Sequence, residues 1–142
     1  MSNGYDHALY QMYLEQVPMF SACSADQLEE IAKLATPRQA QAGEDLVRQG
    51  DPGEEFFVIA SGTATVRRDG DDVATLGEGS FFGELALFDP APRNATVTAV
   101  SSVTTIALSR DAFEQILADV PAIRDGLLRG MAHRLHELDG KA

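Results

Sequence analysis

The chain is short of positive charge. Among its 142 residues 11 are Lys or Arg and 22 are Asp or Glu, which gives a formal net charge of −11. Proteins that bind nucleic acid need clustered basic residues to replace the counterions of the phosphates, and anionic membranes attract the same kind of surface. The composition therefore argues against a nucleic-acid partner and against a membrane partner.

Cysteine and long apolar runs are scarce as well. Cys23 is the one cysteine of the sequence, so no internal disulfide can form. No apolar run reaches the ~18–20 residues that cross a bilayer, and the N-terminus lacks the basic start and apolar stretch of a signal peptide. We therefore expect a cytoplasmic protein that folds as a single domain over residues 1–142.

Three blocks follow one another along the chain: residues 5–35, 36–109 and 109–139. The first block has apolar residues at helical spacing, and Ser24 with Gln27 fits a capping box that opens a helix. The last block is helical again. Its apolar residues predict one stripe along the final helix: Ile123, Leu127, Leu128, Met131, Leu135 and Leu138.

The middle block has the rhythm of a β structure. Short apolar or alternating runs lie between Gly, Pro and Asp turns, and Asp69-Gly70 is predicted to be a hairpin turn. Many short strands at this spacing predict a jelly roll or a barrel. The predicted strands are Leu46–Arg48, Phe56–Ala60, Thr63–Arg68, Val73–Leu76, Ala95–Val100 and Val103–Leu108.

Histidine is absent from residues 36–109, whereas barrel enzymes of the cupin type need a His-rich metal set on their strands. His133 and His136 lie three residues apart on the predicted last helix, but no third metal ligand is evident. No Ser-His-Asp or Cys-His arrangement stands out either. The sequence therefore predicts no catalytic residue, no metal site and no enzyme.

Residues 79–97 interrupt the strand rhythm, because a strand pattern ends at Phe82 and a glycine follows it. Gly83 lets the backbone turn closely, and Glu84–Phe88 fits one short helical turn whose free N–H groups can bind phosphate. Arg93, the one basic residue between Arg68 and Arg110, has planar donors that suit phosphate oxygens. Glu84 would repel a phosphate but can accept a hydrogen bond from a ribose hydroxyl. The set predicts a ribose-phosphate ligand; the alternative is a plain turn in which the two side chains are solvated or pair together.

These residues resemble a known motif. Phe82-Gly83-Glu84-Leu85-Ala86-Leu87, followed by Arg93-Asn94-Ala95-Thr96-Val97, is similar to the phosphate-binding cassette of the cyclic-nucleotide-binding domain family, and we take residues 82–97 as this cassette. The family includes protein kinase A regulatory subunits, cyclic-nucleotide-gated channels and catabolite activators. The resemblance extends from Val17 to Leu138. It implies a mainly β fold, an eight-stranded jelly-roll barrel with an N-terminal helical segment and C-terminal lid helices.

The resemblance also implies roles for individual residues. Glu84 would hold the ribose 2′-hydroxyl and Arg93 the cyclic phosphate, while Val66 and Val73 match strand positions that face the purine or simply fill the barrel. Arg134 matches a position from which some relatives place an arginine on the base; alternatively it pairs with Glu137. Main-chain groups would complete the phosphate site at Gly83, Leu85, Ala86, Asn94 and Ala95.

The residue after the cassette arginine bears on the choice of base. In this family Thr there is associated with cyclic GMP, and Ala or Ser is more usual with cyclic AMP. Asn94 departs from both, and its amide can donate or accept. We favour cyclic AMP over cyclic GMP, with no cofactor beyond this ligand.

The sequence predicts a sensor whose last helix rearranges when the nucleotide binds. No DNA-binding segment follows that helix before Ala142, so we expect a protein effector that the sequence leaves unidentified. The chain could act alone or be part of a larger protein, and the apolar stripe could serve a homodimer or cover the barrel. The competing hypothesis is a degenerate domain that keeps this fold for protein contacts without a ligand.

Overall fold

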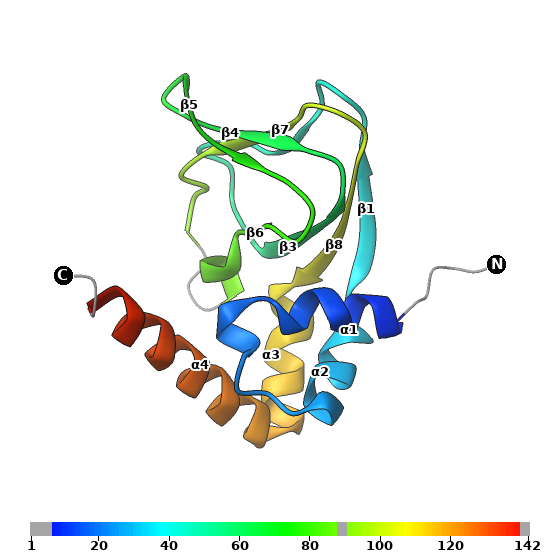
Figure 1. Cartoon of the computed structure of the whole chain (residues 1–142), viewed down its shortest axis with the longest axis vertical. Helices are drawn as coiled ribbons and strands as arrows, with labels where there is room; N and C mark the ends of the chain where they lie inside the picture. The colour runs from blue at the N-terminus through cyan, green and yellow to red at the C-terminus, as the bar shows by residue number, and fades with distance from the viewer. Residues whose placement is uncertain (1–6, 88–90, 140–142) are drawn as a thin grey trace. The chain divides into compact units, whose positions relative to one another are not determined.

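The computed structural model describes the backbone of residues 7–87 and 91–139; the side chains of His7, Met19, Glu84, Leu85 and residues 131–139 lie outside what it describes. Contacts divide the chain into two compact units. Residues 1–34 with 111–142 form the helical unit, and residues 35–110 form the β unit. Figure 1 shows the helices and strands of the two units along the chain.

The helical unit contains helices at both ends of the chain, which confirms the prediction of helical segments there. Within it α1 packs against α2, and the short 3₁₀ helix η1 packs against α4. η1 contains Pro18, which fits the first turn of a helix because proline has no N–H to leave unpaired. The elements are α1 (His7–Glu15), η1 (Pro18–Phe20), α2 (Ala25–Ala32), α3 (Arg110–Asp119) and α4 (Pro121–Asp139).

The start of α2 is the predicted capping box. The Gln27 backbone N–H donates to Ser24 Oγ at 3.1 Å, and the Ser24 backbone N–H donates to Gln27 Oε1 at 2.9 Å. These two bonds satisfy N–H groups that a helix start leaves free. The apolar face that follows buries Leu28, Ile31 and Ala32.

The apolar stripe predicted for the last helix is only partly buried. Ile123 and Leu127 are buried, whereas Leu128 is 57% exposed. One residue along an α-helix turns the side chain by about 100°, so Leu128 points away from the face that Leu127 buries. The predicted stripe therefore has an exposed member at Leu128, next to members that are buried. The side chains of the other members, Met131, Leu135 and Leu138, lie outside the described residues.

Gly126 lies where α4 passes the turn before α2. A Cβ at Gly126 would lie 3.3 Å from both the Ala22 carbonyl oxygen and Cys23 Sγ, so the glycine allows close packing here. Burial raises the pKa of the Cys23 thiol, and the positive charge of Arg129 opposes that shift. A thiol with a raised pKa stays protonated and unreactive near neutral pH.

The β unit is an eight-stranded antiparallel jelly roll, as the resemblance implied. Its strands form two four-stranded sheets, ordered β1-β8-β3-β6 and β2-β7-β4-β5 (Figure 1). Every strand pair is antiparallel. The strands are β1 (Thr36–Ala40), β2 (Asp45–Val47), β3 (Glu55–Ser61), β4 (Ala64–Arg68), β5 (Asp71–Leu76), β6 (Phe81–Phe82), β7 (Thr96–Ala99) and β8 (Val103–Ser109).

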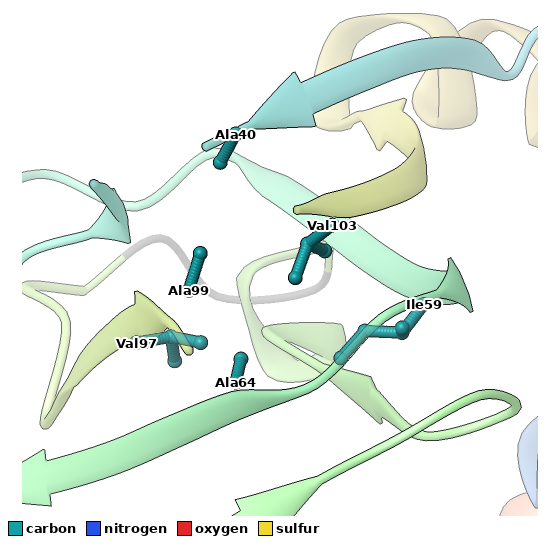
Figure 2. Close-up of a cluster of buried hydrophobic side chains, with 6 residues drawn as sticks. All are labelled: Ala40, Ile59, Ala64, Val97, Ala99 and Val103. Atoms are coloured by element: carbon teal, nitrogen blue, oxygen red, sulfur yellow. The ribbon is translucent and has the colours of Figure 1, made fainter. Parts of the chain in front are cut away.

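Small and branched side chains fill part of the space between the two sheets. Figure 2 shows six of them converging from strands of both sheets. Small residues at several of these positions let the sheets approach closely, which suits the dense packing of protein interiors. The six buried residues are Ala40, Ile59, Ala64, Val97, Ala99 and Val103.

The hairpin predicted at Asp69-Gly70 joins β4 to β5. Arg68 pairs with Asp71 across the turn, and both central residues have positive φ, 55° for Asp69 and 86° for Gly70. Two positive φ values are what a type I′ hairpin requires, and Asp-Gly is a preferred sequence for it.

One strand was missed. The segment Thr36–Ala40 is polar and contains Pro37, so it lacks the apolar alternation of a strand. It nevertheless pairs with β8 as β1, at the edge of its sheet, where only one side needs hydrogen-bond partners.

Candidate functional site

The segment between β6 and β7 begins with a sharp turn. Gly83 has a φ of 84°, a left-handed conformation that glycine adopts without strain. The 3₁₀ helix η2 (Glu84–Leu87) follows, and the Ala86 backbone N–H donates to the Gly83 carbonyl at 3.1 Å. Ala86 and Leu87 are buried. The short helical turn predicted behind the glycine is therefore present.

The Arg93 guanidinium is held by backbone and by an aromatic ring. Its Nη2 donates to the Glu55 carbonyl oxygen at 2.7 Å, and its Cζ lies 5.9 Å from the centroid of the Phe57 ring. Phe57 in turn stacks on Phe82, with ring centroids 5.0 Å apart. A cation over an aromatic face is attracted by the ring's negative face. These contacts fix where the guanidinium lies.

No carboxylate of the described residues forms an ion pair with the positively charged Arg93. In the part of the chain that the structure describes, four ion pairs engage other basic residues and none engages Arg93. Burial lowers the pKa of the Arg93 guanidinium, while the negative charge of Glu55 opposes this shift. Arginine stays protonated at any physiological pH, so Arg93 presents a partly buried cation that Glu55 influences at a distance but that no described carboxylate contacts as an ion pair.

A cavity of about 570 Å³ lies beside this cation. The volume falls in the range of about 300–1,000 Å³ that is typical of small-molecule sites. One part of its wall is the arginine and the Gly83 turn, and most of the rest is apolar. The lining residues are Val66, Leu76, Phe81, Phe82, Gly83, Ala86, Ala91, Pro92, Arg93 and Asn94. Such a cavity suits a ligand with an anionic end and a flat, weakly polar body.

The structure brings together five of the predicted site residues. Gly83, Ala86, Arg93, Asn94 and Val66 all line the cavity. The side chains of three others, Glu84, Leu85 and Arg134, lie outside the described residues.

Ala95 and Val73 do not line this cavity. Ala95 is buried next to Asn94. Val73 is 49% exposed because a register shift separates the pair Val66–Ala74 from the pair Arg67–Asp72. Val73 is the extra residue in this irregularity, so simple alternation along β5 no longer predicts its direction.

Several wall residues were not singled out from the sequence. Phe81 and Phe82 were treated as the end of a strand, and Leu76 as one more strand residue. Gly53, against which Arg93 packs, was not among the predicted site residues. Alternating patterns do not tell which inward residue faces a cavity, because that depends on how the two sheets are apposed.

The described residues contain neither a group of three or more His, Cys, Asp or Glu side chains placed to hold a metal ion nor a helix long and apolar enough to span a membrane.

A family model of the cyclic nucleotide-binding domain matches residues 37–120. The match covers more than half of the chain, so the chain belongs to the cyclic nucleotide-binding domain family.

Individual relatives agree with this assignment. The chain is 35% identical over 121 residues to a cAMP-dependent protein kinase regulatory subunit of Hypocrea atroviridis; the aligned part is 85% of this chain but 25% of that protein. The chain thus spans about a quarter of the length of this curated relative.

Solved structures are similar as well. The crystal structure of the N-terminal domain of a transcriptional regulator from Streptomyces coelicolor A3(2) has a TM-score of 0.83 and 32% identity, covering 90% of this chain and 95% of that one. The regulatory domain of Toxoplasma gondii PKA, crystallised with cAMP, has a TM-score of 0.71 and 25% identity, covering 89% of this chain and 50% of that one.

Proposed function

We propose that this chain is a sensor module that binds a 3′,5′-cyclic mononucleotide in the cavity beside Arg93, with cyclic AMP favoured over cyclic GMP. The observation that carries the proposal is the placement of Arg93. Its guanidinium is half-buried, is anchored through a backbone carbonyl and has no ion-pair partner among the described residues. A cation in this setting is suited to an anionic group such as a cyclic phosphate.

The other groups in the proposal follow from the chemistry of the ligand. Arg93 would bind the phosphate together with main-chain groups of Gly83, Leu85, Ala86, Asn94 and Ala95. Glu84 would accept a hydrogen bond from the ribose 2′-hydroxyl. Val66 would contact the purine inside the cavity that it lines, and Val73 and Arg134 stay proposed base contacts.

The preference for cyclic AMP rests on the relatives. The side chain at position 94 is the one that bears on the choice of base. The Hypocrea relative is named as cAMP-dependent, and the Toxoplasma gondii domain was crystallised with cAMP. Asn94 lines the cavity, and its amide can act as donor or acceptor toward a base. A rearrangement of α4 on binding would pass the ligand state to an effector protein, provided that the nucleotide binds one arrangement more tightly than the other.

The test is a calorimetric titration with cyclic AMP, cyclic GMP and, as a control, AMP. We expect micromolar or tighter binding of a cyclic nucleotide and much weaker binding of AMP. Replacing Arg93 by Ala should weaken the binding at least about 100-fold, because hydrogen bonds to a charged group contribute about 1.5–3 kcal/mol each.

The matched control is Arg48→Ala. Arg48 pairs with Asp45 and does not line the cavity, so this variant should bind as the wild type does. Absence of binding, together with no thermal shift at ~1,000-fold ligand excess over a micromolar Kd, where about 4 kcal/mol of stabilisation is expected, would refute the proposal. The degenerate interaction module would then be the better account.

A further inference from the structure

The loop before β3 lies along the whole of Arg93. The Gly50 backbone N–H donates to the Arg93 carbonyl at 2.8 Å, and the Arg93 N–H donates to the Asp51 carbonyl at 2.8 Å. Pro52 and Pro92 form an isolated antiparallel bridge beside these bonds. This loop therefore fixes the backbone from which the Arg93 side chain starts.

Gly53, at the end of the same loop, lies against the Arg93 side chain. A Cβ built on Gly53 would lie 2.5 Å from Arg93 Nε, 2.8 Å from Cδ and 2.9 Å from Cζ. Heavy atoms that are not bonded do not approach this closely, so the arginine occupies the space that any side chain at Gly53 would need. Gly53 does not have a positive φ, so its backbone conformation by itself would accept alanine.

The guanidinium has little room to move aside. On another side, a Cβ at Gly83 would lie 2.5 Å from Arg93 Nη1. The Glu55 carbonyl holds Nη2, and the Phe57 ring lies 5.9 Å from Cζ. A methyl group added at Gly53 must therefore displace the guanidinium from the Glu55 carbonyl or from the cavity wall.

We propose that Gly53 is a positioning residue for Arg93: the absence of a side chain at Gly53 leaves the space in which the guanidinium is held facing the cavity. The effect of Gly53 on nucleotide binding rests on the proposed function. In that case the loop before β3, which lies outside the cassette, helps to set the affinity for the anionic end of the ligand. The structural content of the inference, the dependence of the Arg93 position on Gly53, is testable without any nucleotide.

The first test is the variant Gly53→Ala, titrated with cyclic AMP and cyclic GMP. We expect about tenfold weaker binding, because the added methyl group overpacks the contact with Arg93 and displaces the guanidinium. The matched control is Gly77→Ala. Gly77 also lacks a positive φ, but a Cβ there would meet only Thr63 Cγ2, at 4.0 Å, so this variant should bind as the wild type does.

The second test separates positioning from a general loss of packing. Gly53→Ala should lower the Tm by about 3–6 °C in the wild-type background. In the Arg93→Ala background the clashing side chain is gone, and alanine reduces the freedom of the unfolded chain. The same change should then leave the Tm unchanged or raise it.

A third measurement follows the guanidinium directly. The ¹⁵N–¹H resonance of Arg93 Nε, identified by its loss in Arg93→Ala, should shift in Gly53→Ala and stay in place in Gly77→Ala. A Gly53→Ala protein with unchanged affinity and an unchanged Nε resonance would overturn the proposal, as would an equal Tm loss in both backgrounds. If the wild type binds no cyclic nucleotide, the proposed function fails, while the resonance and the Tm comparison still decide the role of Gly53.

Discussion

The β unit contains two hollows of nearly equal size. The cavity beside Arg93 measures about 570 Å³, and a second hollow, between β1 and the β2 segment, measures about 560 Å³. Both contain arginine, and Phe57 lines the second hollow while it also contacts Arg93. The second hollow is lined by Arg38, Gln39, Ala40, Gly43, Glu44, Asp45, Leu46, Arg48 and Phe57.

The two hollows differ in what their arginines contact. In the second hollow Arg38 pairs with Glu55 at 2.6 Å and Arg48 pairs with Asp45 at 3.0 Å. Arg93 instead donates to the carbonyl oxygen of Glu55, whose side chain is the partner of Arg38. A carbonyl oxygen orients a guanidinium without neutralising its positive charge. A carboxylate orients the guanidinium and also neutralises the charge.

The comparison shows that neither the volume of a hollow nor the presence of arginine identifies a site for an anion. A ligand phosphate at Arg38 or Arg48 would have to compete with a carboxylate that is part of the protein. At Arg93 that competitor is absent from the described residues, and the ligand can supply the missing negative charge. Three experiments test this difference.

Among these three experiments, the largest effect is expected from Arg93→Lys. Lysine keeps the charge but loses the planar fork and the bond that Nη2 makes to Glu55. We expect about tenfold weaker binding of the cyclic nucleotide by calorimetry. The parallel change Arg48→Lys should leave the affinity unchanged, and an equal loss in the two variants would remove the distinction between the hollows.

A smaller effect is expected from adding one negative charge to each hollow. Asn94→Asp places a carboxylate on the wall of the Arg93 cavity with almost no change of shape. About 1 kcal/mol of repulsion between nearby charges in a wet site corresponds to roughly fivefold weaker binding, and salt should reduce the loss. Gln39→Glu is the matched change in the second hollow. If it weakens binding as much as Asn94→Asp, the effect of charge is not local to the Arg93 cavity.

The smallest effect concerns stability. The pKa of Asp45 is lowered by the hydrogen bond from Thr98 Oγ1, at 2.7 Å, and then by its bond from Arg48. A carboxyl whose pKa is lower in the folded state stabilises the fold above its unfolded pKa of about 3.9, and this stabilisation is lost as the pH falls through the folded pKa.

Asp45→Asn should therefore reduce the free energy of unfolding at pH 6, by less than about 1 kcal/mol because the carboxylate is exposed and screened. Urea unfolding of both proteins between pH 6 and pH 3 measures the difference, which should shrink as the pH falls. A difference that is constant with pH would show that the charge of Asp45 is not its source. Nucleotide affinity at pH 6 should be unchanged.

Much of the fold was predictable because its signals are local. The capping box at Ser24 and Gln27 and the hairpin at Asp69-Gly70 depend on bonds and φ values within a few residues. The cassette turn at Gly83 is equally local, since glycine there permits the positive φ. Strand β1 was missed because its polar residues and Pro37 carry no such signal, and its pairing with β8 is formed across a long stretch of chain.

The sequence by itself determined the family, the jelly-roll pattern of strands, and Arg93 as the candidate cation for a phosphate. Only the tertiary structure decided that Val66 lines the cavity while Val73 does not, because the register between β4 and β5 shifts at that point. It also decided that Gly53 and the Glu55 carbonyl hold Arg93. Such contacts join residues about 40 positions apart, and their geometry depends on how the two sheets and their loops pack, which no local pattern records.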